Sequence, residues 1–140
     1  MQYSVIRDFQ TQDTQAVVAL WQRCDLTRPW NDPHLDIQRK LADSHPFWVF
    51  VDQGRVVATL MVGYDGHRGS VNYLAVDPAC QRRGIARQLM RQAEQYLLEQ
   101  GCPKLNLMVR DGNPAKAFYQ ALGYQLDPVC VLSQRLIHDD

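Results

Sequence analysis

The sequence has no excess of charge of either sign, because 15 Lys and Arg residues are matched by 15 Asp and Glu residues. A balanced chain has no overall field that attracts nucleic acid or an anionic membrane, so any anion site must be local. Apolar runs of membrane-spanning length are also missing, and residues 1–8 lack the apolar core of a secretory signal. We therefore expect neither a nucleic acid nor a membrane among the partners.

Signatures of metal binding and of disulfide pairing are missing as well. The four cysteines are scattered without a CxxC pair, and the four histidines show no metal-ligand spacing. These residues are Cys24, Cys80, Cys102 and Cys130, and His34, His45, His67 and His138. We expect no metal site, and the cysteine pattern favours a reducing cytoplasm.

Length and composition fit a single domain over residues 1–140. With 46% hydrophobic residues, a chain of 140 residues can bury one sizeable core. Apolar periodicity and turn signals predict six strands and four helices. The strands are Tyr3–Arg7, Phe47–Asp52, Arg55–Tyr64, Val71–Val76, Leu105–Val109 and Val129–Leu136, and the helices begin near Thr11 or Asp13, at Asp32–Pro33 (to about Ser44), near Gly84 (to Gly101) and at Pro114 (to Leu122).

The order of these elements predicts an α/β (α+β) fold with a mixed, mostly antiparallel sheet. Short breaks such as Gln53–Gly54 join the earlier strands as an antiparallel meander. The strand–helix–strand unit from Val71 to Val109 instead requires a right-handed crossover and parallel pairing.

The most informative segment is Gln81–Ala86, which joins an apolar strand to a long amphipathic helix. A helix start leaves about four N–H groups without partners and carries the positive end of the helix dipole, which suits a bound anion. Gly84 lets the backbone approach a bulky ligand, and Ala86 keeps the next turn small. The segment has neither the GKS or GKT end of a Walker loop nor the three glycines of a dinucleotide fold. It predicts a pyrophosphate loop, and a tight turn with solvated arginines is the alternative.

A second motif, Asn113–Tyr124, has the pattern of a capped short helix that ends at Gly123 and re-enters a strand. Together with the Gln81–Ala86 loop, it resembles the GNAT family of acyl-CoA-dependent N-acetyltransferases, over roughly Val5 to Leu136. The resemblance implies that two central parallel strands splay apart and that acyl-CoA enters the V-shaped opening between them. In this chain the splayed pair is expected to be Val71–Val76 and Leu105–Val109.

The resemblance implies acetyl-CoA as the acyl donor. Its pyrophosphate is expected on the amides of residues 82–86, with Arg82 or Arg87 near the ribose phosphate. Its pantetheine amides can pair with a free strand edge at Leu74–Val76. The predicted donor site comprises Leu74, Ala75, Val76, Gln81, Arg82, Arg83, Gly84, Ile85, Ala86, Arg87, Asn113, Ala115 and Tyr119.

Two residues are expected to carry the chemistry. Acyl transfer to an amine passes through a tetrahedral intermediate, and a backbone N–H at Leu74 or Ala75 is predicted to stabilise its oxyanion. Tyr119 follows Ala115 on the same helix face, and the resemblance implies that it is the general acid for the sulfur. From spacing alone, Tyr119 is instead a core aromatic. Asn113 likewise fits a plain N-cap, whereas family members often use the matching asparagine to contact pantetheine.

The sequence does not identify a general base. The only two glutamates, Glu94 and Glu99, both fall on the long helix. Leu107–Arg110 resembles the L-E-V-R stretch of ribosomal-protein N-terminal acetyltransferases, but Met108 replaces the glutamate proposed as base in that branch. The remaining candidates are Asp25, Asp65, His67 and the hydroxyl of Tyr73.

The acceptor pocket is expected between the loop joining the first two helices and the hairpin before the central strand, lined by Trp30, Tyr64 and Asn72. Trp30 also fits a plug that closes the core. The acceptor would be a primary amine on a small molecule, a peptide N-terminus or a lysine. A non-catalytic acyl-CoA sensor, suggested by Met108, and a nucleotide-phosphate protein unrelated to CoA are the alternatives. The sequence leaves monomer and homodimer open.

Overall fold

A five-stranded mixed sheet forms the centre of the computed structural model, which describes residues 3–140. The spatial order follows the chain order, and its strands are β1 (Ser4–Asp8), β2 (Phe47–Asp52), β3 (Arg55–Tyr64), β4 (Gly69–Val76) and β5 (Leu105–Asn106). The first four strands pair antiparallel and β4 pairs parallel with β5, which confirms the predicted mixed sheet. The side chains of β2 are buried almost without alternation, as expected for a strand covered on both faces.

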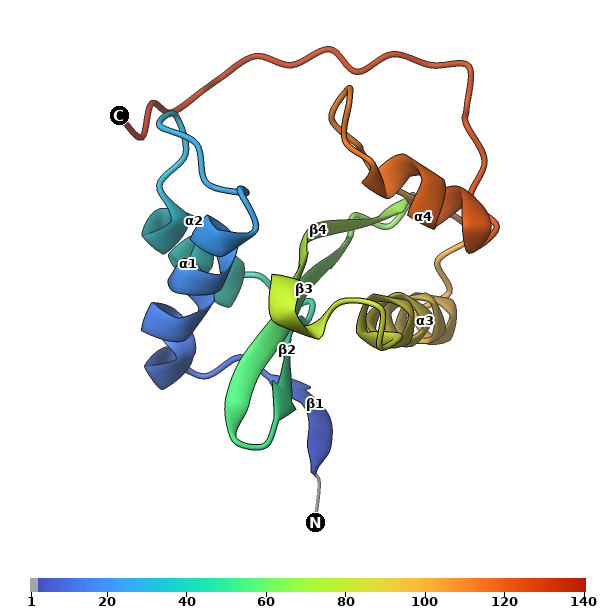
Figure 1. Ribbon diagram of the computed structural model, residues 1–140. Helices are drawn as coiled ribbons and strands as arrows, with labels where there is room; N and C mark the ends of the chain where they lie inside the picture. The colour runs from blue at the N-terminus through green and yellow to red at the C-terminus, as the bar shows by residue number, and fades with distance from the viewer. Residues whose placement is uncertain (1–2) are drawn as a thin grey trace.

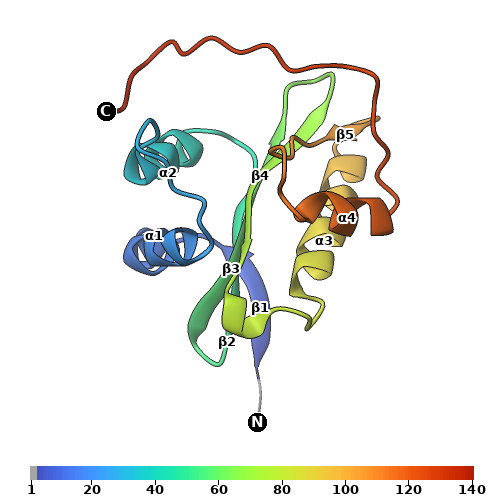
Figure 2. The ribbon, with the colours of Figure 1, turned by 45° about the horizontal axis from the view of Figure 1, so that its top comes forward.

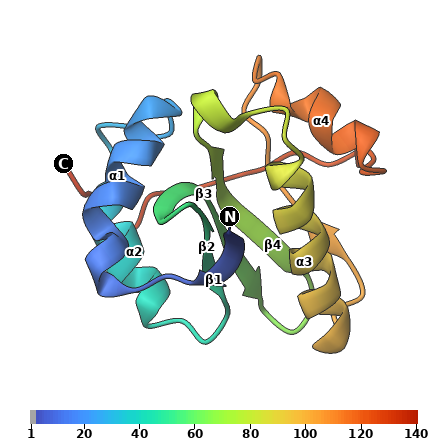
Figure 3. The same ribbon diagram turned by 60° about the horizontal axis from the view of Figure 1, so that its bottom comes forward.

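Helices cover both faces of this sheet (Figures 2 and 3). Helices α1 (Thr14–Arg23) and α2 (Pro33–Leu41) lie on one face, and α3 (Ile85–Glu99) and α4 (Ala115–Ala121) lie on the other. Short 3-10 turns, Thr11–Asp13 and Pro78–Cys80, precede α1 and α3. Each face has its own hydrophobic core, so the sheet separates the two helix layers.

The beginning of α2 follows directly from its sequence. The Asp32 carboxylate accepts hydrogen bonds from the amides of His34, at 2.9 Å, and Leu35, at 3.4 Å. Pro33 occupies the first helical position, where its missing N–H costs no hydrogen bond. The predicted cap is therefore confirmed.

Strand β4 contains a β-bulge that the sequence analysis did not anticipate. Its register against β3 shifts between Thr59 and Met61, and Tyr73 adopts a left-handed φ of 54°. The Thr59 hydroxyl donates to the Tyr73 carbonyl at 2.8 Å and accepts from Trp21 Nε1 at 2.9 Å. The rings of Trp21 and Tyr73 stack with centroids 3.7 Å apart. A bulge bends its strand and re-aims the residues after it, here Leu74 onward.

Strands β4 and β5 pair only at their beginnings. Gly69 pairs with Leu105 and Ser70 with Asn106, and no further ladder joins the two strands in residues 3–140. Beyond these pairs β5 ends, although the sequence predicted a strand to Val109. The edge of β4 beyond Ser70 consequently lacks a β5 partner among the described residues, as expected for a splayed pair.

The predicted final strand, Val129–Leu136, is wrong. The segment has no strand or helix assignment, and Leu132 is 92% exposed. It runs as an extended arc from α4 to α2 (Figure 1). With only two residues, β5 offers too short an edge for another strand to hydrogen-bond along its length. The alternating apolar pattern therefore has no sheet to join.

Candidate functional site

The turn between β4 and α3 has the backbone geometry of an anion-binding loop. Gly84 is the N-cap of α3 with φ of 78°, and Arg82 has φ of 66°. Left-handed residues at this spacing can turn successive N–H groups toward one concave surface. Over the described part of the chain, no amide from Gln81 to Arg87 donates to a partner outside α3. These amides are the unpaired donors expected at a helix start.

Two side chains anchor this loop to the protein, and two nearby arginines remain without an ion pair in the described chain. Ile85 is only 3% exposed and fixes the first turn of α3 in the core. The Arg83 guanidinium is paired with the Asp52 carboxylate at 3.1 Å, so it is directed toward β2. Arg82 and Arg87, by contrast, form no ion pair with another residue of 3–140. Ala86 is partly buried beside them.

The edge of β4 predicted to meet pantetheine has contrasting side-chain environments. Ala75 is 2% exposed and belongs to the core under α1 and α2. Leu74 and Val76 are partly buried and pack against the core under α3. Cys24 donates its thiol to the Val76 carbonyl at 3.3 Å, and burial raises the pKa of that thiol. Because these side chains already pack inside the protein, the backbone is what this edge can offer a ligand.

Tyr119 lies on α4 among aromatic neighbours. Its ring centroid is 5.2 Å from that of Phe118 and 6.0 Å from that of Tyr124. Its hydroxyl has no hydrogen-bond partner in residues 3–140. Burial raises the pKa of Tyr119, so the hydroxyl stays protonated at neutral pH.

The Asn113 side chain contacts the first turn of α4, as the sequence suggested. The Asn113 side-chain oxygen accepts from the amide of Ala115, itself partly buried, at 2.8 Å. Asn113 thus satisfies one amide of the first turn through its side chain, although the N-cap position of α4 is Pro114. The side-chain NH2 of Asn113 is not engaged in it and is available to a ligand.

The two glutamates both accept hydrogen bonds from neighbouring side chains. Glu94 accepts from the Tyr124 hydroxyl at 2.5 Å and from Arg91 at 2.7 Å. Glu99 accepts from the Gln95 side chain at 3.0 Å. Met108, which stands where the related branch has a glutamate, is 71% exposed. None of these positions supplies an available carboxylate to the β4 bulge.

The other candidate bases differ sharply in their environment. Asp65 accepts from the amides of His67 and Arg68 in the β3–β4 hairpin, and Asp25 has an exposed side chain. Tyr73 donates its hydroxyl to Asp36 at 2.6 Å. Burial, followed by this hydrogen bond to a carboxylate, raises the pKa of Tyr73. The Tyr73 hydroxyl therefore stays protonated, and the basic group of the pair is Asp36.

The three predicted acceptor-lining residues do not gather in one place. Trp30 is 43% exposed in the loop between α1 and α2, and Asn72 is exposed in β4. Tyr64 lies at the β3–β4 hairpin end, where its hydroxyl donates to the carbonyls of Gly66 and Gly101. Tyr64 therefore lies at the end of β4 opposite the Gln81–Ala86 loop.

Several residues that shape this region were missed by the sequence analysis. Trp21 and Thr59 hold the bulge, while Asp36, Arg39 and Asp139 form a charged cluster beside it. Thr59 could have been noticed in the sequence, because it is the single polar residue in the apolar run Val56–Val62. The charged cluster could not, since Asp139 is 100 residues away from Arg39 in the chain.

Residues 3–140 contain neither a metal-ligand cluster nor a helix able to span a membrane. No group of three His, Cys, Asp or Glu side chains is arranged there to hold a metal ion. The longest described helix, α3, has 15 residues and is polar on one face, and none of the helices in this range could cross a bilayer.

Comparisons with known proteins agree with this architecture. The sequence profile described as the Acetyltransferase (GNAT) family matches residues 15–124. Acetyltransferases of Sodalis glossinidius and Pectobacterium atrosepticum are 50% and 48% identical to this chain, and in each case 96% of both chains is covered.

Solved structures show the same fold. The aminoglycoside N-acetyltransferase AAC(6')-Iy in complex with CoA superposes with a TM-score of 0.79 at 16% identity, covering 98% of this chain and 97% of that one. The Escherichia coli ribosomal-protein-S18-alanine N-acetyltransferase has a TM-score of 0.74 at 25% identity, covering 86% and 77%. With the profile match and the two bacterial relatives, the mixed sheet and its flanking helices show that this chain belongs to the GNAT family of acetyltransferases.

Proposed function

We propose that this protein transfers the acetyl group of acetyl-CoA to a primary amine by direct attack in a ternary complex. The observation that carries the proposal is the loop before α3, with unpaired amides and left-handed φ at Arg82 and Gly84. Such a loop supplies N–H donors and the positive end of a helix dipole to a pyrophosphate. Arg82 and Arg87, which lack partners among the described residues, are the cations for the ribose phosphate.

The remaining donor contacts follow the splayed edge of β4. Leu74, Ala75 and Val76 offer their backbone groups to the pantetheine amides, in the manner of an added strand. Ala115 and the free side-chain NH2 of Asn113 border the same opening from the start of α4. The four cysteines are all free thiols, which supports a reducing cytoplasm as the site of action. We retain one domain over residues 1–140, as a monomer or homodimer.

The reaction needs three groups from the protein. The amine nitrogen attacks the thioester carbonyl carbon, and the N–H of Leu74 stabilises the oxyanion that forms. The C–S bond then breaks, and the Tyr119 hydroxyl gives its proton to the departing thiolate. Burial keeps this hydroxyl protonated until that step.

The proton of the attacking amine must also leave. Asp36 is a carboxylate that the structure links to β4, through the Tyr73 hydroxyl. Its side chain is 21% exposed, so it is reachable from solvent. We propose that Asp36 takes the amine proton, directly or through water.

The test combines binding and turnover. Calorimetry should show that the protein binds CoA in preference to ATP, because only CoA carries a pantetheine arm for the β4 edge. A nucleotide-phosphate protein unrelated to CoA would show no such preference. A panel of primary amines with acetyl-CoA should give acetylated product, and Tyr119→Phe should lower kcat by about 100-fold or more. Tight CoA binding with no turnover of any amine would instead support the non-catalytic sensor that Met108 suggests.

A further inference from the structure

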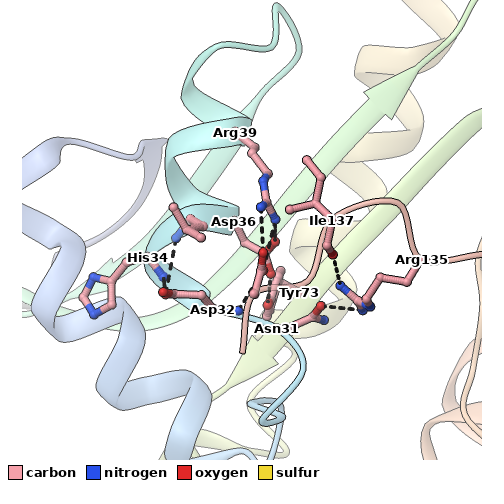
Figure 4. A network of polar contacts seen from close by, with 10 residues as sticks. Asn31, Asp32, His34, Asp36, Arg39, Tyr73, Arg135 and Ile137 are labelled. Carbon is pink, nitrogen blue, oxygen red and sulfur yellow. Dashed lines mark hydrogen bonds and ion pairs between the residues drawn. The ribbon is translucent and has the colours of Figure 1, made fainter.

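A buried carboxylate at the C-terminus of the chain lies in a fitted site on α2. The Asp139 side chain is only 1% exposed, although the residues before it lie open to solvent. Its two oxygens accept from both terminal nitrogens of Arg39, at 2.8 Å and 3.2 Å, and one oxygen also accepts from the Asp32 amide at 3.0 Å. Figure 4 shows Arg39 and Asp32 facing the C-terminal segment that carries Arg135 and Ile137. The paired contact with a planar guanidinium is the geometry in which arginine recognises a carboxylate most strongly.

The surroundings of this site are suited to an anion. The Asp32 amide lies at the N-terminus of α2, where the helix dipole is positive. The hydrogen bonds from Arg39 and then from the Asp32 amide lower the pKa of Asp139 to about 2. A hollow of about 420 Å³ adjoins the site, lined by Arg39 and residues 133–137. There is therefore room beside the carboxylate for more than one side chain.

The chain before Asp139 is held to the rest of the protein by little else. Across residues 129–138 of the described chain, one side chain bonds outside the segment: Arg135 donates to Asn31 at 2.9 Å. The segment has no sheet or helix, and most of its apolar side chains are exposed. A competing carboxylate can therefore displace Asp139 without unfolding any element of the fold.

The site also lies next to the reaction region. Arg39 is 3.4 Å from Asp36, and Asp36 accepts from the Tyr73 hydroxyl at the β4 bulge. Tyr73 immediately precedes Leu74, and α2 covers the sheet face opposite α3 (Figure 2). A ligand on Arg39 would consequently approach from the side opposite the pyrophosphate loop. Such a ligand would meet the cationic Arg39 guanidinium and the anionic Asp36 carboxylate next to each other.

We propose that Arg39 and the Asp32 amide form a carboxylate-binding site for the acceptor, and that Asp139 occupies it as a stand-in for the acceptor's own carboxylate. The acceptor is then a small amino-acid-like molecule with an amine and a carboxylate. Arg39 holds its carboxylate and Asp36 attracts its ammonium group. The inference rests on the proposed acetyltransferase function, and the tail competes with the acceptor for the same site.

The first experiment reads the site directly, without turnover. In amide NMR spectra of the protein saturated with CoA, which carries no acetyl group to transfer, Asp139→Asn should shift the Asp32 resonance, whereas Asp140→Asn should leave it in place. Probes would be the common L-amino acids, their C-terminal amides, and a peptide of residues 135–140. In the Asp139→Asn protein the peptide and carboxylate-bearing probes should move the Asp32 resonance toward its wild-type position, and the amides should not. The site is refuted if no carboxylate probe moves it, or if amides move it equally.

The second experiment uses matched amines as acceptors. Each amino acid that the enzyme acetylates should have a KM about 10- to 100-fold below that of its C-terminal amide. Arg39→Gln should remove most of this difference in KM while leaving CoA affinity unchanged. Arg68→Gln, an arginine in the β3–β4 hairpin, is the control. Asp139→Asn should lower the KM for carboxylate-bearing amines alone, because it removes the competitor. Equal KM values for amino acids and their amides would overturn the inference while leaving the proposed acetyltransferase function intact. A protein that acetylates no amine would instead refute the proposed function, and the NMR result would then decide whether the carboxylate site exists.

Discussion

The Thr59 hydroxyl connects the core to the β4 bulge, and replacing it by a methyl group tests whether the bulge is held as described. Thr59 and Trp21 are both fully buried. Thr59→Val removes the acceptor of Trp21 Nε1–H and the donor to the Tyr73 carbonyl, with little change in side-chain shape. Each of these two buried groups costs about 1–3 kcal/mol when left without a partner, and the added methyl returns roughly 0.8 kcal/mol. We therefore expect a net loss of about 1–5 kcal/mol.

Urea unfolding followed by tryptophan fluorescence measures this loss. The unfolding midpoint should fall while the slope m stays unchanged, because the surface exposed on unfolding is the same. For a chain of 140 residues the entropy of unfolding is about 0.3 kcal/mol/K, so the melting temperature should fall by roughly 4–17 °C. Turnover should also fall, since the bulge sets the direction of the Leu74 amide.

The matched control is Thr14→Val, the same chemical change outside the core. The Thr14 hydroxyl donates to the Thr11 carbonyl at 2.7 Å in an exposed contact. Water can replace that bond, so the loss should stay below about 1 kcal/mol. A Thr59→Val protein as stable as Thr14→Val, with normal turnover, would refute the account of how the bulge is held.

Three further predictions concern the donor site. Gly84→Val should weaken CoA binding, measured by calorimetry, by at least about tenfold. The control is Gly54→Val in the β2–β3 turn, because Gly54 has the same φ of 78° and equally open surroundings. It should carry a similar backbone strain and leave CoA affinity unchanged. Arg82→Ala should weaken binding of CoA more than binding of dephospho-CoA, and an equal loss for both would move the ribose-phosphate contact to Arg87. Arg83→Ala should leave the ratio of the two affinities unchanged, because Arg83 is paired with Asp52. Catalysis needs the protonated Tyr119 hydroxyl, so on the alkaline side activity should fall as pH rises through a pKa that burial holds above the ordinary value of about 10. An alkaline limb that persists in Tyr119→Phe would assign it to another group.

Local signals in the sequence determined much of this protein. Three helix starts depend on atoms within a few residues, so the residue types alone specify them. They are the cap at Asp32 with Pro33 beside it, the start of α3 at Gly84, and the contact of the Asn113 side chain with the Ala115 amide. The apolar runs of β2 and β3 likewise specify strands because their lengths and turn residues are local. The two motifs were sufficient to indicate the family, and the donor loop that they predict stays a prediction.

Tertiary structure decided the features that depend on contacts between distant residues. The bulge needs Trp21 to meet Thr59, 38 residues away, and the buried carboxylate needs Asp139 to meet Arg39, 100 residues away. The segment Val129–Leu136 has the alternation of a strand but no partner edge, since a strand is completed by hydrogen bonds to a neighbour that its own sequence does not encode. Periodicity therefore fixed which residues could form elements, and pairing across the fold decided which of them did.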